Sequence, residues 1–399
     1  MSYRTLADVD AGGMTVFCRV DFNVPLTGGA ISDDRRIRAA LPTIEHLASA
    51  GARVVCASHL GRPKGERKPG LGLRPVAARL GQLLDREVPL SADCIGEPAS
   101  GLVSSLSPGG VGLLENLRFH RAETEGDPEF ARQLAGAADL YVNDAFGAAH
   151  RAHASITGVP RVVGRAAAGF LMQRELESLS RLLSDARRPY VAILGGAKVS
   201  DKIPLIERLL ERVDTILVGG AMAYTFLKAR GVEVGASRVE ADRVELAADL
   251  DARARARGVA IELPLDHVTA ESIDGQRVGG LTTTDGVTIS AGSMGVDIGP
   301  KTLSAWREIL DERLETVLWN GPVGMFEADG CERGTSGLAE RLAELPAFRV
   351  LGGGDTAAAV ARFGLAERYD HVSTGGGAAL EYLSGSELPG VASLEEHSS

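Results

Sequence analysis

The stretch Gly352-Gly353-Gly354-Asp355-Thr356 follows the apolar run 348–351 and precedes an alanine-rich helical pattern at 356–363. It therefore predicts a strand, a glycine-rich turn and a helix in succession. Ser373-Thr374-Gly375-Gly376-Gly377 repeats this arrangement after the segment 369–372. Glycines at such a junction let the backbone come close to a ligand, and the free N–H groups of a helix start favour anions. Two such turns predict a cradle for phosphate groups.

Asp355 supplies the carboxylate that is needed to hold a Mg²⁺ ion bridging phosphates. Close packing alone explains a single glycine-rich turn equally well, but two of them, one followed by Asp-Thr, favour nucleotide binding. The P-loop pattern that ends in Gly-Lys-Ser/Thr is absent from the sequence, and so is a complete G-x-G-x-x-G after a strand. These absences exclude a P-loop ATPase and a standard dinucleotide-binding fold.

Short apolar runs recur along the chain, and a glycine-rich or polar loop closes each run before a helical pattern begins. The runs are Thr15–Val20, Arg53–Ala57, Val111–Leu114, Leu140–Val142, Tyr190–Leu194, Thr215–Val218, Ala260–Leu263, Thr316–Trp319 and Phe348–Leu351. Strands that alternate with helices predict an α/β fold with doubly wound parallel sheets covered on both faces. Ligands bind such sheets at the carboxyl ends of the strands, so the residues after each run are candidates for function.

The predicted strands form two sets, one on each side of Gln173–Leu183, whose leucines lie on one side of a helix. We therefore expect a first domain at 1–170, a connecting helix or hinge at 171–188 and a second domain at 189–387. The C-terminal segment 388–399 begins with Leu-Pro-Gly-Val, which is too apolar for a free tail. We expect this segment to dock on the first domain.

Composition and charge narrow the class of protein. The 399 residues are enough for two domains with hydrophobic cores. The formal net charge of −10, from 43 basic and 53 acidic residues, argues against nucleic-acid and membrane partners, because a basic field is missing. The four cysteines have no metal-type spacing and predict buried thiols in a reducing compartment. No secretory signal and no membrane-spanning run is present, so we expect a soluble, cytoplasmic protein.

Basic residues follow the predicted strands of the first half. His59 and Arg62 come after the second strand, Arg118 after the third and Arg151 after the fourth, while Arg36 follows the loop after the first. A lone histidine is more often structural and a loop arginine is usually solvated, but their joint placement at one sheet edge favours a basic pocket. In an acidic protein, such a pocket suits a small molecule with a phosphate and a carboxylate.

Other polar residues accompany these cations. Asp21 and Asn23 come after the first strand and are candidates for positioning hydroxyl or carboxyl oxygens of a substrate. Asp144 follows the fourth strand, and we expect it to orient neighbouring loops.

In the second half, Gly195-Gly196-Ala197-Lys198 follows the fifth predicted strand and leads to Lys202 and Pro204. Because proline is tolerated only in the first turn of a helix, the helix is expected to begin near Asp201 or Lys202. A lysine at a helix start is unfavourable unless an anion is bound there, so the two lysines indicate bound phosphate. After the eighth strand, Asn320 is expected near the phosphates and Glu327 is a possible acceptor for a ribose hydroxyl.

Six stretches of the sequence resemble the motifs of the phosphoglycerate kinase family, in the family's order and over essentially the whole chain. They are Arg19–Pro25, Ser58–Pro63, Asn143–His153, Gly195–Lys202, Leu318–Glu327 and Gly352–Thr356. Motifs of this length are highly specific, and no expected site position departs from the family's pattern. The resemblance implies two doubly wound domains joined by a helical hinge. It also implies reversible, Mg²⁺-dependent phosphoryl transfer from 1,3-bisphosphoglycerate to ADP, giving 3-phosphoglycerate and ATP in glycolysis and gluconeogenesis.

The resemblance further assigns residues to the substrates. Those expected to hold the triose are Asp21, Asn23, Arg36, His59, Leu60, Gly61, Arg62, Arg118 and Arg151. Those expected to hold the nucleotide are Lys202, Gly295, Asn320, Glu327, Gly353, Gly354, Asp355 and Thr356, with Mg²⁺ on Asp355. The transfer step is assigned to Arg36, Lys198, Lys202, Gly375 and Gly376. These small molecules are the only partners implied, and the expected oligomeric state is a monomer.

The residue types are consistent with this chemistry. A carboxylate acceptor is already ionised at neutral pH, so a site rich in arginine and lysine needs no general base and acts by alignment and charge stabilisation. Because the half-sites lie in different domains, closure about the connecting helix must bring the substrates together. Two alternatives remain. One is a nucleotide-binding scaffold or sensor, which need not carry Arg36, Lys198, Lys202 and Asp355, and the other is a kinase for a different small acid.

Overall fold

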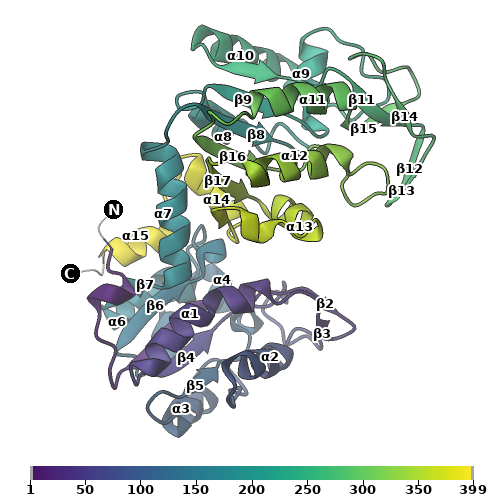
Figure 1. Ribbon diagram of the computed structural model, residues 1–399. Helices are drawn as coiled ribbons and strands as arrows, with labels where there is room; N and C mark the ends of the chain where they lie inside the picture. Colours follow the sequence, from purple (N-terminus) through teal and green to yellow (C-terminus); the bar gives the residue numbers. More distant parts are fainter. Residues whose placement is uncertain (1–2, 397–399) are drawn as a thin grey trace. The chain divides into compact units, whose positions relative to one another are not determined.

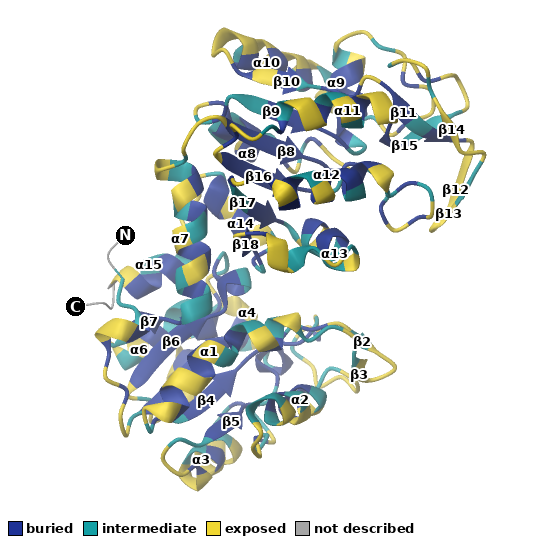
Figure 2. Ribbon diagram, viewed as in Figure 1, coloured by how far each residue is buried: buried dark blue, intermediate teal, exposed yellow. Residues whose placement is uncertain are grey.

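The computed structural model describes residues 3–396 and divides into two compact units (Figure 1). Unit 1 consists of residues 1–177 and 387–399, and unit 2 consists of residues 178–386. Each unit has its own parallel sheet with helices, which confirms the predicted α/β fold. Strands of both sheets are buried, while the outer sides of the helices are exposed (Figure 2). No helix within residues 3–396 is both long and apolar enough to cross a membrane.

The sheet of unit 1 has the strand order β5-β4-β1-β6-β7, and its neighbouring strands all pair in parallel. The strands are β1 (Thr15–Val20), β4 (Arg53–Ala57), β5 (Val111–Leu113), β6 (Leu140–Asp144) and β7 (Ala166–Ala168). Arg19 on the central strand β1 lies opposite Ala57 on β4 and Asn143 on β6. The carboxyl ends of these three strands are therefore level, and the loops that follow them start at one edge of the sheet.

Helices cover both faces of this sheet. Successive side chains of a strand point to opposite faces, and Val16, Cys18 and Val20 share a core with residues of α1 (Arg35–Ser49) and α2 (Arg74–Leu84). On the other face, α3 (Gly96–Ser105) and α5 (Pro128–Ala135) line a cavity of about 160 Å³ together with Phe17 and Val55.

The C-terminal segment packs on unit 1. Its helix α15 (Pro389–Glu396) contacts β7, α6 (Val159–Val163) and the π-helical turn η4 (Ala154–Gly158). The Gly390 N–H donates to the Ala149 carbonyl at 2.8 Å, and a Cβ at Gly390 would lie 2.9 Å from the Ala149 Cα, so only glycine fits this close approach. Residues 1–2 of the predicted first domain and 397–399 of the predicted docking segment lie outside the described residues.

The sheet of unit 2 has the order β10-β9-β8-β16-β17-β18 and is also parallel throughout. Its strands are β8 (Tyr190–Leu194), β9 (Thr215–Val218), β10 (Ala260–Glu262), β16 (Thr316–Asn320), β17 (Phe348–Gly352) and β18 (His371–Val372). In the ladder, Asn320 at the end of β16 pairs with Leu194 on one side and Gly352 on the other. The glycine turns that follow β8 and β17 therefore flank Asn320.

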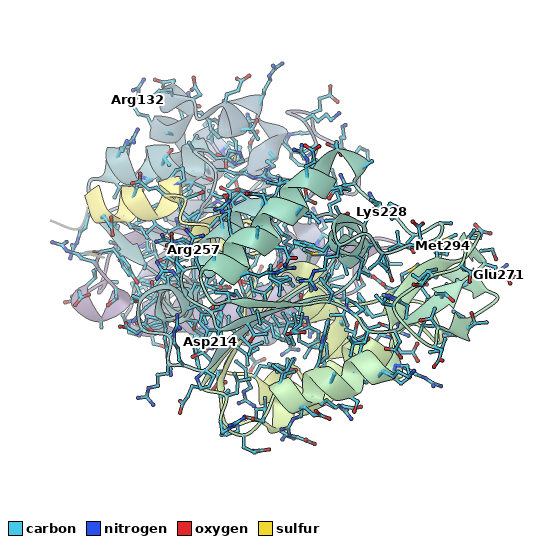
Figure 3. The ribbon with its side chains drawn as sticks, turned by 90° about the horizontal axis from the view of Figure 1, so that it is seen from above. Arg132, Asp214, Lys228, Arg257, Glu271 and Met294 are labelled. Atoms are coloured by element: carbon cyan, nitrogen blue, oxygen red, sulfur yellow. The ribbon has the colours of Figure 1, made fainter. Side chains whose placement is uncertain are left out.

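An antiparallel excursion, marked by Glu271 and Met294 in Figure 3, lies outside this sheet. It contains β11 (His267–Ala270), β14 (Thr282–Thr283) and β15 (Met294–Ile298) in the order β14-β11-β15, and the hairpin of β12 (Ser272–Asp274) and β13 (Arg277–Gly279). The polar composition of this segment reflects its exposure, because residues 271–277 are all exposed.

The structure differs from the sequence-based expectations at strand ends and around the connecting helix. Strands β6, β16 and β17 continue to Asp144, Asn320 and Gly352, beyond their last apolar residues, because ladder pairing extends that far. The connecting helix α7 spans Phe170–Ser184, and the boundary between the units falls within it, after Glu177. Asp144 caps the start of α7, since its Oδ1 accepts hydrogen bonds from the N–H groups of residues 171 and 172 at 2.9 and 3.2 Å.

Candidate functional site

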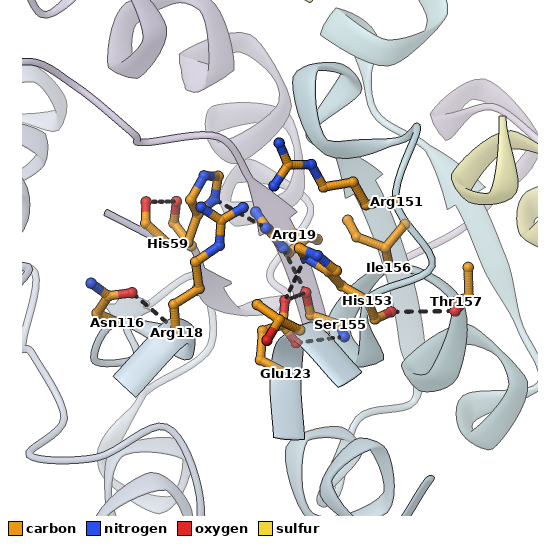
Figure 4. A network of polar contacts seen from close by, with 12 residues as sticks. Arg19, His59, Asn116, Arg118, Glu123, Arg151, His153, Ser155, Ile156 and Thr157 are labelled. Atoms are coloured by element: carbon orange, nitrogen blue, oxygen red, sulfur yellow. Dashed lines mark hydrogen bonds and ion pairs between the residues drawn. The ribbon is translucent and has the colours of Figure 1, made fainter. Parts of the chain in front are cut away.

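Arg19 is the centre of a buried polar network at the carboxyl edge of the unit 1 sheet (Figure 4). Its Nε donates to the Ser155 hydroxyl at 2.9 Å and its Nη1 donates to the Val20 carbonyl, while its Nη2 lies 3.3 Å from His59 Nδ1. Glu123, which is also fully buried, accepts from the Ser155 N–H at 2.9 Å and from its hydroxyl at 2.6 Å. This network fixes the orientation of a buried cation next to His59.

His59 is a neutral side chain of this pocket. It is only 5% exposed, and burial lowers its pKa well below the usual range, although the nearby Asp21 carboxylate opposes that shift. His59 can therefore donate or accept a hydrogen bond at neutral pH but adds no positive charge. The positive charge of the pocket therefore comes chiefly from its arginines, and the expected role of His59 in holding the substrate stays a prediction.

Asp21 and Asn23 connect the loop after β1 to its neighbours, Asp21 to helix α1 and Asn23 to the loop after β4. Its carboxylate accepts a hydrogen bond from Arg36 Nη1 at 2.8 Å. Burial would raise the pKa of Asp21, but positive neighbours that include Arg36 lower it below the usual value. The Asn23 side chain accepts from the Gly61 N–H at 2.8 Å, and Gly61 has φ of +64°, a conformation that glycine adopts at little cost.

Arg118, in the short turn η2 (Leu117–Phe119), joins the same cluster from the loop after β5. Its Nη1 donates to the Gly61 carbonyl at 3.0 Å, and its Nε is buried with no hydrogen-bond partner among the described residues. Burial and the nearby Arg151 lower the pKa of Arg118 to about 10. The unpartnered Nε and the adjacent cation make this pocket suited to an anion.

Three further residues that are expected to hold the triose differ in burial and in hydrogen bonding. Leu60 is buried, and its N–H and carbonyl both contact the Asn116 side chain, at 3.2 and 2.8 Å. Arg151 is half-buried, and its Nε donates to His150 Nε2 at 3.0 Å. Arg62 is exposed. Contacts thus bring together Asp21, Asn23, Arg36, His59, Leu60, Gly61 and Arg118, whereas Arg62 lies on the surface.

In unit 2, Asn320 is fully buried, and both its side-chain Oδ1 and Nδ2 have no hydrogen-bond partner among residues 3–396. Its carbonyl accepts from the Gly195 N–H at 3.0 Å. A Cβ at Gly352 would lie 2.8 Å from Asn320 Nδ2, so glycine is required there by close packing. A buried amide with neither group satisfied is rare in proteins, and its position between two glycine turns indicates a polar ligand.

The turn that follows β17 has the predicted geometry. Gly353 has φ of +91° and precedes α13 (Gly354–Arg362), with exposed Asp355 in its first turn. The Thr356 hydroxyl accepts from the Gly321 N–H at 2.7 Å and donates to the Gly352 carbonyl at 2.9 Å. Thr356 therefore holds the turn against β16.

Lys202 lies immediately before the short helix α8 (Ile203–Leu209), as the position of Pro204 predicts. It is only 9% exposed, and burial lowers its pKa to about 8, although the carboxylates of Asp201 and Asp355 oppose that shift. The influence of Asp355 places it within electrostatic range of Lys202. A buried lysine with this pKa is poised to receive an anion.

The other residues that the family resemblance assigns to the nucleotide and to the transfer step differ in burial. Lys198 and Glu327 are exposed. Gly295 lies on β15, and its N–H donates to the Ser237 hydroxyl at 2.9 Å; a side chain there would collide with Tyr224, so packing alone requires the glycine. Gly376 has φ of +51° and directly precedes α14 (Gly377–Leu383).

Sequence reasoning missed Arg19, Asn116, Glu123 and Ser155, which hold the pocket of unit 1 in place. The only indication was Arg19 itself, a charged residue in an otherwise apolar buried strand. Glu123 and Ser155 lie in segments that reach the pocket only through the tertiary fold, so their spacing carries no pattern.

A family model described as phosphoglycerate kinase matches residues 6–386. The chain belongs to the phosphoglycerate kinase family. The phosphoglycerate kinase of Anaeromyxobacter dehalogenans is 52% identical over 399 residues, which are 99% of this chain and 100% of that protein. That of Clostridium novyi is 48% identical over 398 residues, 99% of each.

Solved structures agree with this assignment. The phosphoglycerate kinase of Coxiella burnetii matches with a TM-score of 0.88 at 37% identity, over 100% of both chains. That of Pyrococcus horikoshii matches with a TM-score of 0.87 at 34% identity, over 99% of both chains. The chain is therefore a glycolytic kinase, which transfers a phosphoryl group reversibly between 1,3-bisphosphoglycerate and ADP.

Proposed function

We propose that unit 1 binds 3-phosphoglycerate or 1,3-bisphosphoglycerate, that unit 2 binds ATP or ADP with Mg²⁺, and that closure about α7 precedes in-line transfer. The observation that carries this proposal is that each unit has, among its described residues, a group of polar side chains with unsatisfied hydrogen-bonding atoms or unpaired charge. Unit 1 has a buried arginine cluster with the unpartnered Arg118 Nε, and unit 2 has the unpartnered Asn320 side chain and buried Lys202 beside glycine turns. Each set lacks an anionic or polar partner of the kind that its proposed substrate supplies.

In unit 1, the triose carries a phosphate and a carboxylate. Arg118, Arg151 and Arg62 offer guanidinium groups that suit either anion. Asp21 and neutral His59 suit the triose hydroxyl, while Asn23 and the backbone of Leu60 and Gly61 shape the loop around it. Arg36, the remaining residue that the family resemblance assigns to the triose, holds Asp21 through an ion pair of 2.8 Å.

In unit 2, the residue types fit a magnesium nucleotide. Mg²⁺ is usually held by one or two carboxylates together with phosphate oxygens, and exposed Asp355 at the start of α13 provides such a carboxylate. The ion supplies charge neutralisation of the phosphates. Gly353, Gly354 and Thr356 form the turn that approaches the phosphates, and Asn320 contacts them. Glu327 accepts a hydrogen bond from the ribose, and Gly295 is a further neighbour of the nucleotide.

For the transfer step, Arg36 and Lys202 contact the equatorial oxygens of the transferring group, helped by Lys198 and the backbone at Gly375 and Gly376. The carboxylate acceptor is ionised at neutral pH, so no residue needs to remove a proton. Alignment and preorganised positive charge then account for catalysis.

Closure is required because the two half-sites belong to different units of one chain, joined by α7. Small-angle scattering of the protein with both substrates should show compaction relative to the free protein. Equal radii of gyration in the two states would contradict closure. Since one chain carries both half-sites, we also propose that the protein is a monomer, and we propose that it is cytoplasmic. Light scattering after gel filtration tests the oligomeric state.

The experiment that tests this function measures ATP-dependent phosphorylation of 3-phosphoglycerate, coupled to reduction of the acyl phosphate, for the wild type and Arg36→Ala. We expect activity in the wild type and a fall of two to three decades in the variant, about 3–4 kcal/mol of barrier, with nucleotide binding unchanged. Arg36→Lys keeps a point charge and should retain part of the activity. Wild-type protein that binds nucleotide but shows no turnover would instead support the scaffold or another acid substrate.

A further inference from the structure

Asp93, Cys94 and His120 of unit 1 form a cluster of metal-binding side chains outside the residues assigned to either substrate. Each offers one potential ligand atom, and the three atoms lie within 4.8 Å of one another. Among residues 3–396, no other three His, Cys, Asp or Glu side chains are grouped in this way. The spacing of the cysteines did not indicate the cluster, because His120 approaches Cys94 only in the folded chain.

Local structure holds the three residues in place. The Ser91 N–H donates to the Leu113 carbonyl at 2.9 Å, which ties the turn containing Asp93 and Cys94 to the end of β5. The ring of His120, directly after η2, packs against Phe130 with a centroid distance of 5.2 Å. The backbone positions of the cluster are therefore set without any ligand.

The Asp93 carboxylate uses its two oxygens differently. Oδ1 faces the cluster, where it lies 2.7 Å from His120 Nε2 and accepts from the Cys94 N–H at 2.7 Å. Oδ2 accepts from Arg67 Nη2 at 2.8 Å, and the same Nη2 donates to the Ala92 carbonyl at 2.8 Å. Arg67 thus orients the carboxylate from behind and leaves Oδ1 turned toward Cys94 and His120. Outer contacts of this kind typically orient metal ligands.

Access and exposure also suit a metal ion. The side chains of Asp93 and His120 are 27% and 28% exposed, so an ion can reach them from solvent. Cys94 is 1% exposed and closes the inner side of the cluster. A thiolate, an imidazole and a carboxylate are ligands that Zn²⁺ prefers, whereas Mg²⁺ prefers oxygen ligands alone.

We propose that Asp93, Cys94 and His120 bind one thiophilic divalent cation of the Zn²⁺ class, with water in the fourth position. When the ion binds, the Cys94 thiol loses its proton to solvent. The hydrogen bond between His120 and Asp93 is replaced by bonds from both side chains to the metal. Metal bonds of about 2.0–2.3 Å place tetrahedral ligands roughly 3.2–3.8 Å apart. His120 Nε2 and Asp93 Oδ1, now 2.7 Å apart, must therefore separate by about half an ångström, and ligand atoms that lie up to 4.8 Å apart must approach by about 1 Å. The bound ion links the turn before α3 to the segment that follows Arg118, and it does not depend on the nucleotide site.

Co²⁺ is the probe, because its tetrahedral thiolate complexes absorb visible and near-ultraviolet light. The full-length protein is titrated without nucleotide and in excess Mg²⁺, which keeps Co²⁺ off oxygen-only sites. We expect one equivalent to bind with a dissociation constant on the order of micromolar or tighter, with a thiolate-to-metal charge-transfer band. Zn²⁺ should displace Co²⁺ and raise the unfolding temperature of the protein, since it binds the native state.

Variants separate this site from other thiols. Cys94→Ser should abolish the charge-transfer band. Arg67→Ala, which keeps all three ligands but removes the contacts of Arg67 to Asp93, to the Ala92 carbonyl and to the Phe119 ring, should weaken binding about 10- to 100-fold. Cys331→Ser, at a buried free cysteine of unit 2, is the matched control and should bind as the wild type does. If circular dichroism shows that Cys94→Ser is unfolded, the part-exposed His120→Gln decides, and wild-type affinity in it overturns the proposal. A band that survives in folded Cys94→Ser, or no band in the wild type, also overturns it.

Discussion

The two half-sites differ in what holds them together. In unit 1, charged side chains are buried and joined to one another, from Glu123 through Ser155 and Arg19 to His59. In unit 2, glycine turns and backbone contacts set the geometry, and the charged residues Lys198, Glu327 and Asp355 are exposed. The pocket of unit 1 is therefore preorganised by its own polar network. In unit 2, backbone turns surround polar and charged side chains that gain their partners from a ligand.

This difference fits the size and chemistry of the substrates that we propose for the two units. A small triose offers few atoms, so specificity requires side chains fixed in advance by buried contacts. A nucleotide brings its own metal and several phosphate oxygens, so backbone turns with a few cations suffice. Lys202 and Asn320 are exceptions in unit 2, because their polar side chains are buried. Variants of such residues are therefore a direct test of the comparison.

The largest effect is expected for Lys202→Met. Removing the cation should lower kcat by two to three decades, about 3–4 kcal/mol of barrier, because the charge acts on the transferring group. The fold should not weaken, because removing the buried charge also removes the cost of its desolvation, which lowers the pKa of Lys202. Steady-state kinetics and urea unfolding of the same variant measure both quantities. A loss of stability that matches the loss of activity would show that Lys202 is structural.

A second test uses the pH dependence of stability. Burial lowers the pKa of Lys202 to about 8 from an unfolded value of about 10.4, so the folded protein loses this proton first as pH rises. The cost of the buried charge is fully present below pH 8 and is relieved between about pH 8 and 10.4, by roughly 3 kcal/mol in total. The stability of the wild type relative to Lys202→Met should therefore rise over this window. A difference that stays constant with pH would indicate that the folded lysine has an ordinary pKa.

The third test compares one hydroxyl from each half-site. Ser155→Ala leaves the buried Arg19 Nε without its acceptor, and Thr356→Val leaves the Gly321 N–H without one. Each change should cost about 1–3 kcal/mol of unfolding free energy. Ser155→Ala should raise KM for 3-phosphoglycerate several-fold and leave KM for ATP unchanged, while Thr356→Val should do the reverse. If either variant changes both constants equally, the half-sites are not independently organised.

Local patterns predicted those parts of the molecule that depend on neighbouring residues in the sequence. Apolar runs located nine strands of the two parallel sheets, and Pro204 located the start of α8 to within two residues. The glycine turn before α13 was predicted for the same reason, since its conformation depends on residues 352–356 themselves.

What the patterns did not reveal depends on contacts between distant segments. Arg19, Glu123 and Ser155 meet only in the folded unit, and the neutral state of His59 follows from burial that no sequence motif encodes. The strand β7 was missed because three alanines carry no clear periodicity, and its pairing with β6 defines it. The cluster of Asp93, Cys94 and His120 was missed for the same reason, because His120 is distant from the other two residues in the sequence and meets them only in the folded chain.

The last test concerns acid sensitivity. Burial lowers the pKa of His153 in unit 1 to about 3, and that of His267 in unit 2 to about 4. As pH falls below the unfolded value of about 6.5, the unfolded state gains these protons first, so stability is complete above pH 6.5 and is lost below it. Each histidine contributes up to about 1.4 kcal/mol per pH unit in this range.

Unit 1 also contains His59, whose pKa is lowered well below 6.5, so its histidines should cause about twice the loss per pH unit that His267 causes in unit 2. Hydrogen exchange of amides in β1 and β8 at pH 7 and pH 5 reports the two units separately, and the fluorescence of Trp306 and Trp319 reports unit 2 alone, since both tryptophans of the chain lie in its core. His46→Gln, at an exposed position of unit 1, should leave the acid response unchanged, whereas His153→Gln should reduce it. Equal acid responses in the two units would mean that the buried polar network of unit 1 is more accessible to protons than its geometry implies. In that case, buried side chains would not hold the site of unit 1 more rigidly than backbone turns hold the site of unit 2.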